Sequence, residues 1–180
     1  MIDLETLGTR ADSVIISIGA VKFNKHDAQI GDHLFYESVS IDSNYASNMG
    51  QRHISEDTIN WWMKQSPEAQ IVFREPKNTL MASLESLRSW VCEEDDVDAA
   101  TVQVWGNGAG FDVTMLEHAY ATKGLEIPWQ YFNARCFRTV KNLPQALTVA
   151  KPANTLAHHA ASDAMWQAVH LQAIWKAMHP

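Results

Sequence analysis

Apolar residues within the first forty positions follow the pattern of β-strands. Residues 1–6 and 13–24 are rich in Ile, Val and Leu and are separated by the turn-like segment LGTRAD. Residues 33–41 are enriched in β-branched and aromatic side chains, which favour a third strand. We therefore expect a hairpin and a further strand at the start of the fold.

The middle of the chain changes to a spacing that is typical of helices. Ser55 is a candidate N-cap for a helix that begins with EDTINWWMKQ, and Pro67 follows soon after this segment. A second helix is expected over 78–92, where large apolar residues recur at intervals of four, three and four: Leu80, Leu84, Leu87 and Val91. Two helices are thus predicted to follow the three strands.

The second half of the chain predicts one more strand and several helices. TVQVWGN (101–107) is a short strand, and a helix is expected over 111–123. Residues 133–150 are expected to be partly helical, and the Ala-rich segment 158–178 predicts a long last helix. Strands followed by helices in this order indicate one α/β domain over 1–180, with a sheet flanked by helices.

Composition narrows the class of protein without identifying it. The chain is 46% apolar and 19% charged, which is ordinary for a globular protein and excludes a disordered one. There is no apolar run long enough to span a membrane and no secretion signal, so the cytoplasm is the default expectation. Cys92 and Cys136 lie far apart without metal-ligand spacing and are expected to be reduced thiols.

The net charge of −7 argues against a protein that binds a polyanion through its overall field. A local nucleic-acid site is still compatible with this charge, because clustered carboxylates inflate the negative count and divalent cations would neutralise them.

Two carboxylates in the first predicted strand are the first candidate for chemistry. Asp3 and Glu5 are two positions apart, so on a strand they share one face. Like charges this close are unfavourable unless a cation lies between them, and oxygen ligands suit Mg²⁺ or Mn²⁺. The simpler interpretation is that both side chains face solvent. Only two residues precede Asp3, which raises the question of whether this strand continues upstream.

A third carboxylate follows a glycine-rich turn in VWGNGAGFDVTML. Asp112 lies in the first turn of the predicted helix, where it could simply stabilise the helix N-terminus. The three glycines could form a phosphate-binding loop. However, the Gly-Lys-Ser/Thr sequence of a nucleotide-binding P-loop is absent, which argues against that type of site.

The segment LAHHAASDAM brings a histidine and a fourth carboxylate together. Asp163 lies near the start of the last predicted helix, five residues after His158. Histidine titrates near neutral pH and is therefore suited to activate water as a general base. A structural role for either residue remains an alternative at this point.

Taken together, the ordered segments DLET, NGAGFD and HHAASD resemble the three motifs of DEDDh 3′–5′ exonucleases. That family includes ribonuclease T, oligoribonuclease and polymerase proofreading domains. The start DLETLG and the segments TINWWMKQS and PWQYFNARCFRT are most similar to its small phage and bacterial branch. Within the third motif, His158 rather than His159 has the spacing His-x-Ala-x-x-Asp that ends at Asp163.

The resemblance implies a ribonuclease-H-like fold, with a central mixed sheet, and a reaction that uses two Mg²⁺ or Mn²⁺ ions. Asp3 would bridge both ions, Glu5 and Asp163 would hold the ion that binds the attacking water, and Asp112 would support the other. His158 would deprotonate the water. The expected substrates are the 3′ ends of single-stranded DNA or RNA or 3′ overhangs, and the products are nucleoside 5′-monophosphates.

Substrate contacts are predicted for five residues: Thr6, Leu7, Phe111, Trp62 and Arg138. The first two follow the first motif, where the family places backbone and apolar contacts to the terminal nucleotide, and Phe111 would line the base pocket. Trp61 and Trp62 point about 100° apart on a helix, so one could stack on a base while the other packs in the core. Arg138 belongs to a basic cluster that would contact phosphate or form a solvated helix face.

Two other functions remain open from the sequence alone. A metallophosphodiesterase could use His158, His159 and Asp163 on a small substrate and would not need Glu5. A catalytically weak nucleic-acid-binding module derived from an exonuclease is the second alternative, although all four carboxylates and the histidine are present. Dimers are common in the resembled family, so a homodimer also remains open.

Overall fold

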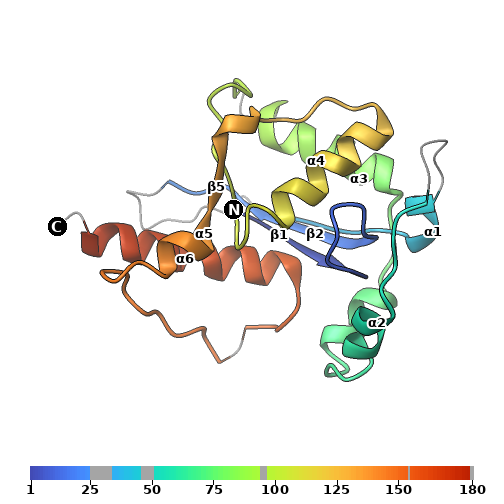
Figure 1. The fold of residues 1–180 in the computed structure, drawn as a ribbon, viewed down its shortest axis with the longest axis horizontal. Coiled ribbons are helices and arrows are strands. Elements are labelled where there is room, and N and C mark those ends of the chain that lie inside the picture. Colours follow the sequence, from blue (N-terminus) through green and yellow to red (C-terminus); the bar gives the residue numbers. More distant parts are fainter. Residues whose placement is uncertain (25–33, 46–50, 94–96, 154, 179–180) are drawn as a thin grey trace.

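The computed structural model describes residues 1–24, 34–45, 51–93, 97–153 and 155–178 (Figure 1). A five-stranded sheet lies at its centre in the order β3-β2-β1-β4-β5. The strands are β1 (Ile2–Thr6), β2 (Ile15–Val21), β3 (Leu34–Ser38), β4 (Val104–Gly106) and β5 (Ala134–Cys136). The first three strands pair antiparallel, whereas β1–β4 and β4–β5 pair parallel. This mixed sheet confirms the expected α/β fold class.

Helices cover both faces of the sheet. The α-helices are α1 (Ile41–Tyr45), α2 (Glu56–Trp62), α3 (Leu80–Arg88), α4 (Asp112–Lys123), α5 (Phe137–Lys141) and α6 (Ala160–Met178). Shorter turns are the 3-10 helices η1 (Ala69–Phe73) and η3 (Tyr131–Asn133) and the π-helical turn η2 (Ser89–Glu93). No helix in the described part of the chain is long and apolar enough to cross a membrane.

Figure 1 shows α3 and α4 on one side of the sheet and α6 on the other. The core on the α3/α4 side contains Leu4 of β1, Leu84 of α3 and Leu116 of α4. A second apolar cluster joins Phe137 of α5 to Ala168 of α6 and their neighbours. Alternate residues of β1 therefore face different layers, as the two-residue period of a strand requires.

The local sequence signals identified most of these elements. The structure places β1, β2 and β3 within the ranges 1–6, 13–24 and 33–41, and residue 33 lies outside the described residues. Ser55 caps α2 as predicted, since its hydroxyl accepts a hydrogen bond from the Thr58 amide at 3.4 Å.

One strand was not anticipated. Residues 133–150 were expected to be partly helical, and α5 is indeed helical, but Ala134–Cys136 form β5. Three residues are too few for a strand pattern to be recognised. The strand exists because β4 offers a parallel partner, which pairs Trp105 with Arg135 and Gly106 with Cys136.

The start of α6 lies directly against β2 at Gly19. A Cβ atom at Gly19 would lie 2.1 Å from the backbone carbon of Ala160 and from the amide nitrogen of Ala161, so only glycine fits this approach. Gly19 pairs with Asp3 across the β1–β2 ladder. The first turn of α6 is therefore held next to the carboxylate-bearing face of β1.

Candidate functional site

Strand β1 presents Asp3 and Glu5 on the sheet face that α6 covers. Ile2 and Leu4 point the other way into the core below α3 and α4. The Glu5 side chain is buried, with 8% of its surface exposed. The predicted solvent-facing alternative for this carboxylate therefore does not apply, and its charge must be balanced inside the site.

Asp112 reaches the same place from the first turn of α4. Within the described strands, β1 and β4 pair at Ile2 and Gly106, and the ladder ends there. The Leu4 amide instead donates to the Asp112 carboxylate at 3.2 Å. A Cβ atom at Gly106 would lie 3.0 Å from Asp112 Oδ2, so this glycine leaves room for the carboxylate. The Asp112 side chain thus accepts the hydrogen bond from β1 that the next residue of β4 would otherwise accept.

Helix α6 supplies two further groups from adjacent turns. Asp163 forms an ion pair with the ammonium group of Lys151, which lies in the segment before α6. Gln167, one turn further along, donates from Nε2 to Asp3 Oδ1 at 2.7 Å and is only 2% exposed. The sequence interpretation missed Gln167, although its position four residues after Asp163 was a signal that both share a helix face.

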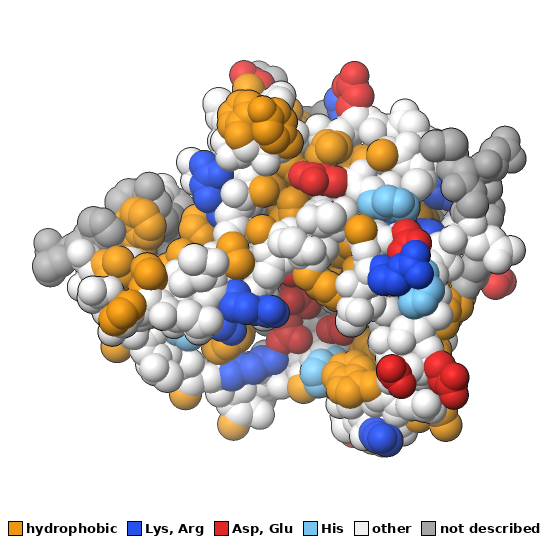
Figure 2. Space-filling model, in the orientation of Figure 1, with side chains coloured by type: hydrophobic (Ala, Val, Ile, Leu, Met, Phe, Trp, Pro, Cys, Tyr) orange, Lys and Arg blue, Asp and Glu red, His pale blue; other side chains and the backbone are white. Residues whose placement is uncertain are grey.

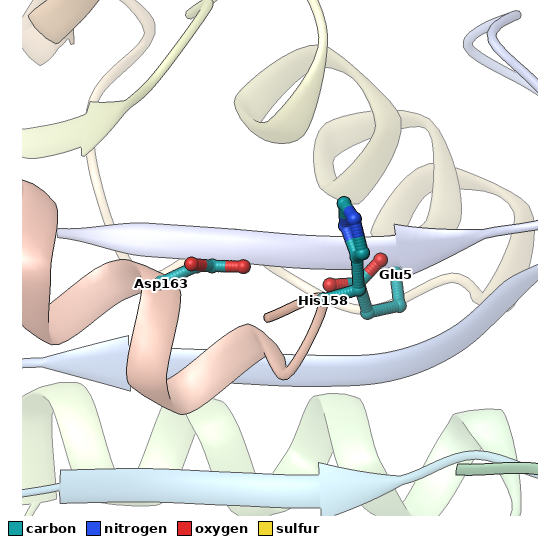
Figure 3. Close-up of side chains that lie close together, drawn as sticks. All are labelled: Glu5, His158 and Asp163. Atoms are coloured by element: carbon teal, nitrogen blue, oxygen red, sulfur yellow. The ribbon is translucent and has the colours of Figure 1, made fainter. Parts of the chain in front are cut away.

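His158 completes the group from the residue pair that precedes α6. Ligand atoms of Glu5, His158 and Asp163 lie within 4.8 Å of one another (Figure 3). The backbone of His158 has a φ of 57°, in the left-handed region that few non-glycine residues adopt. Such local strain, held in place by surrounding structure, is typical of functional sites.

Burial and mutual repulsion raise the pKa values of the clustered carboxylates. Burial first, and then the charges of Asp163 and Asp112, raise the pKa of Glu5 to about 8, although Lys151 opposes the change. The pKa of Asp3 is raised well above its ordinary value by burial and by the other three carboxylates.

Asp112 is less strongly affected. Burial raises its pKa to about 6, while backbone hydrogen bonds at Gly108 and Leu4 and the charge of Arg138 act in the opposite direction. Protons or cations are therefore needed to balance this cluster at neutral pH.

The donor set fits a hard divalent cation. Carboxylate oxygens dominate, and one imidazole lies beside them. Figure 2 shows acidic side chains at the base of a hollow in this face of the molecule, with basic side chains and a histidine around it. A polyanionic substrate could therefore approach the cluster only if cations shield it, and basic groups at the rim would assist.

The two adjacent tryptophans have different environments. Trp62 is 2% exposed and its indole N–H donates to the Thr6 carbonyl at 2.9 Å. The prediction that Trp62 stacks on a base is therefore corrected, because a side chain with 2% of its surface exposed leaves no ring face open to a base. Trp61 is 40% exposed and its ring lies edge-on to His158, with ring centroids 4.7 Å apart.

The remaining predicted substrate residues lie at different depths. The Leu7 side chain is 1% exposed, so it packs in the core and cannot form the apolar contact predicted for it. Thr6 is also buried, and its hydroxyl donates to the Gly8 carbonyl at 2.8 Å. Phe111 is half-buried at the N-terminus of α4, and Arg138 is exposed beside Gly108.

The two neighbouring histidines are clearly separated by the fold. The ring of His159 stacks on Tyr36, with centroids 4.2 Å apart, and its Nδ1 accepts from the Ser162 amide. His158, in contrast, lies with Glu5 and Asp163. A site that needs both histidines together with Asp163 is not supported by this arrangement.

A mixed sheet with two carboxylates on its central strand, joined by carboxylates from α4 and α6, defines the class of ribonuclease-H-like 3′–5′ exonucleases. More particularly, residues 1–175 match the model of the Rv2179c-like 3′-5′ exoribonuclease domain, and the chain belongs to this family. The protein is thus a 3′–5′ exonuclease, a hydrolase of phosphodiester bonds.

The chain is also similar to an exodeoxyribonuclease of Enterobacteria phage T4. The two are 26% identical over 157 residues, which cover 77% of this chain and 68% of the phage protein. No solved structure matches the chain significantly.

Proposed function

We propose that this exonuclease shortens single-stranded nucleic acid or 3′ overhangs from the 3′ end by a two-metal reaction with His158 as the general base. The observation that carries the proposal is the cluster in which buried Glu5 and the half-buried His158 and Asp163 place ligand atoms within 4.8 Å of one another. Asp3 lies close enough to this cluster for the charges of Glu5, Asp112 and Asp163 to raise its pKa. Asp112 is held beside β1 by the hydrogen bond from the Leu4 amide.

Four carboxylates would hold the ions: Asp3, Glu5, Asp112 and Asp163. Mg²⁺ or Mn²⁺ bound there would supply stabilisation of the charge that develops on the attacking and leaving oxygens. The protein's own contribution is a rigid arrangement of these ligands. The amides of Leu4 and Gln167 fix Asp112 and Asp3 by hydrogen bonds before any substrate arrives.

His158 would accept a proton from the attacking water at a ring nitrogen. Its imidazole lies beside Glu5 and Asp163, where a water activated in the cluster would be within reach. The rings of Trp61 and His158 are in contact and nearly perpendicular, with centroids 4.7 Å apart. We further propose that the exposed part of Trp61, rather than Trp62, contacts the terminal base, and that Phe111 lines the base pocket.

The family and the phage relative are named for different sugars. The family description names an exoribonuclease, whereas the T4 protein is an exodeoxyribonuclease. Both act on nucleic acid, and the proposed chemistry at the scissile phosphate is the same for DNA and RNA. Discrimination between RNA and DNA would come from contacts of the protein to the 2′-hydroxyl group.

A digestion time course tests the proposal. Matched 5′-labelled single-stranded DNA and RNA would be incubated with and without Mn²⁺, and a ladder that shortens from the 3′ end is expected only with the metal. The faster ladder identifies the sugar. Asp3→Ala and His158→Ala should each reduce the rate by at least about 100-fold, the latter through the loss of general-base catalysis.

Glu126→Gln is a suitable control, because this carboxylate is exposed and far from the cluster, with an ion pair to Arg88 at 3.6 Å. Full activity of the Asp3 or His158 variant in the presence of Mn²⁺ would contradict the assigned roles. Metal-independent shortening would contradict the two-metal reaction.

A further inference from the structure

An exposed pair of aromatic side chains lies outside the metal-binding cluster. Tyr131 is 80% exposed and Phe132 is 60% exposed, which makes them the most exposed aromatic residues in the described part of the chain. Their rings contact each other edge to face, with centroids 5.2 Å apart. Contiguous exposed apolar surface, unlike scattered single residues, is a common mark of a binding surface.

The turn that carries this aromatic pair is firmly anchored. Asn133, the third residue of η3, is buried and its side-chain amide donates to the Ala100 carbonyl at 2.9 Å. On the other side, the Arg135 guanidinium donates to the Phe132 carbonyl at 2.8 Å. The rings are therefore presented by a fixed backbone, so little conformational entropy would be lost when a ligand stacks on them.

Basic residues connect the aromatic pair with the catalytic cluster. Figure 1 shows the chain running from η3 through β5 to α5, and this stretch carries a basic edge that consists of Arg135, Arg138 and Lys141. Figure 2 shows hydrophobic side chains projecting at the top of the molecule and Lys or Arg side chains between them and the acidic hollow.

The register of the sheet places Arg135 on the same face as the catalytic carboxylates. Arg135 pairs with Trp105, which neighbours Gly106, and Gly106 pairs with Ile2. Paired residues point to the same side, so Arg135 shares the face of Asp3. With strands about 4.8 Å apart and a rise of about 3.3 Å per residue, their Cα atoms are separated by about 12 Å.

Arg138 continues this path to the site itself. Its guanidinium carbon lies 3.6 Å from the position that a Cβ atom would occupy at Gly108, in the turn before Asp112. Its positive charge also acts on the carboxylate of Asp112. An extended ligand whose end is bound at the carboxylates would therefore pass Arg138 and Arg135 before it reached the aromatic pair.

We propose that Tyr131 and Phe132 form a stacking platform for bases of the single strand upstream of its 3′ terminus, and that the basic edge binds the intervening phosphates. This inference rests on the proposed function. The combination of stacking rings and a basic track suits a single-stranded nucleic acid, because every base has a π-face and every linkage carries a negative charge.

A second copy of this chain is a poorer occupant of the same surface. A two-fold interface brings the same patch of both copies together, so the basic edges would face one another and repel. A nucleic acid neutralises this edge, whereas the net charge of the whole chain, −7, disfavours the approach of a polyanion elsewhere on the molecule.

The test compares substrates that do and do not reach the platform. A Tyr131→Ala/Phe132→Ala variant is expected to raise the KM for a single strand of about 15 nucleotides by about 10- to 100-fold, with kcat unchanged. Its kinetics on a dinucleotide should equal those of the unmodified protein. Tyr131→Phe keeps the ring and should retain the original KM, and Met81→Ala, an exposed residue of α3, is a matched control for loss of apolar surface.

Binding measured in EDTA separates this inference from the proposed function. Fluorescence anisotropy of a labelled 15-mer does not require catalysis, and the double variant should weaken binding by a similar factor. Arg135→Gln should reduce the salt dependence of binding by about one counterion. If the protein cleaves no oligonucleotide but binds the 15-mer through the aromatic pair, only the proposed function fails.

Two results would overturn the inference. Equal loss of activity on the dinucleotide and the 15-mer would show that the aromatic pair acts on the catalytic site rather than on an upstream strand. An unchanged KM, with a change from dimer to monomer in light scattering, would instead identify the surface as an interface between copies.

Discussion

Asp3 is bound by one amide and repelled by three carboxylates. Gln167 donates to it at 2.7 Å, while Asp112, Glu5 and Asp163 disfavour its charged form. The oxygen of the same Gln167 amide, Oε1, is buried without a hydrogen-bond partner among the described residues. A buried oxygen without a hydrogen-bond partner is unfavourable, so its retention here indicates that the amide has a role, which we infer to be positioning of the Asp3 carboxylate.

Replacing Gln167 by Met should therefore weaken metal binding without unfolding the protein. Loss of a hydrogen bond that orients a metal-binding carboxylate is expected to reduce Mn²⁺ affinity by about 10-fold or more. Calorimetric titration with Mn²⁺ measures this change directly. Gln172→Met is the control on the same helix, because its amide donates to the Asn24 carbonyl instead. Equal Mn²⁺ affinity in both variants would show that Gln167 serves packing alone.

At the scale of secondary-structure elements, the site depends on how closely α6 approaches β2. Gly19 allows the backbone of Ala160 and Ala161 to lie where a side chain would otherwise be. Because His158 and Asp163 flank this contact, any displacement of the helix start moves both away from Glu5. The contact therefore links a single glycine to the geometry of the whole cluster.

Gly19→Ala is expected to reduce exonuclease activity by at least about 100-fold, since displacements near 1 Å can already cost this much. The strain should also lower the free energy of unfolding by about 1–3 kcal/mol. Gly110→Ala is a matched control, because a Cβ atom there would have no neighbour within 4 Å. Activity assays and thermal unfolding check both effects, and a fully active Gly19→Ala protein would contradict the described packing.

For the whole molecule, we expect the carboxylate cluster to couple the free energy of unfolding to pH and to metal ions. The pKa of Glu5 is about 8 in the folded protein and 4.5 as its ordinary value. Between these values the folded state binds more protons than the unfolded state. Unfolding then releases protons, so the free energy of unfolding falls as pH rises.

We therefore expect the metal-free protein to lose stability between pH 5 and pH 8, on the order of a few kcal/mol from this cluster. Mn²⁺ should restore much of this loss at pH 8, because it binds the folded state and replaces the missing protons. Thermal unfolding in EDTA and in Mn²⁺ at both pH values measures the effect. Glu5→Gln should flatten the pH dependence. A metal-free protein that is most stable at pH 8 would refute this reasoning.

Short-range patterns identified the elements that are long or strongly capped. Ser55 capped its helix as expected, and the apolar spacing from Leu80 to Leu87 matched α3. By contrast, β5 has only three residues and owes its conformation to pairing with β4, which lies about thirty residues earlier in the chain. The local propensity of these three residues carries no information about a distant pairing partner, so the strand could not be predicted from its own residues.

The sequence alone predicted which residues would carry the chemistry. The two-residue period of a strand placed Asp3 and Glu5 on one face, and the resemblance to the exonuclease motifs selected Asp112, His158 and Asp163. Only the tertiary structure decided which neighbours face the site. Trp62 is buried and donates a hydrogen bond to Thr6, whereas Trp61 is exposed beside His158, and His159 stacks on Tyr36. These choices depend on the approach of α2 and α6 to β1 and β2, and that approach is set by long-range packing rather than by local sequence.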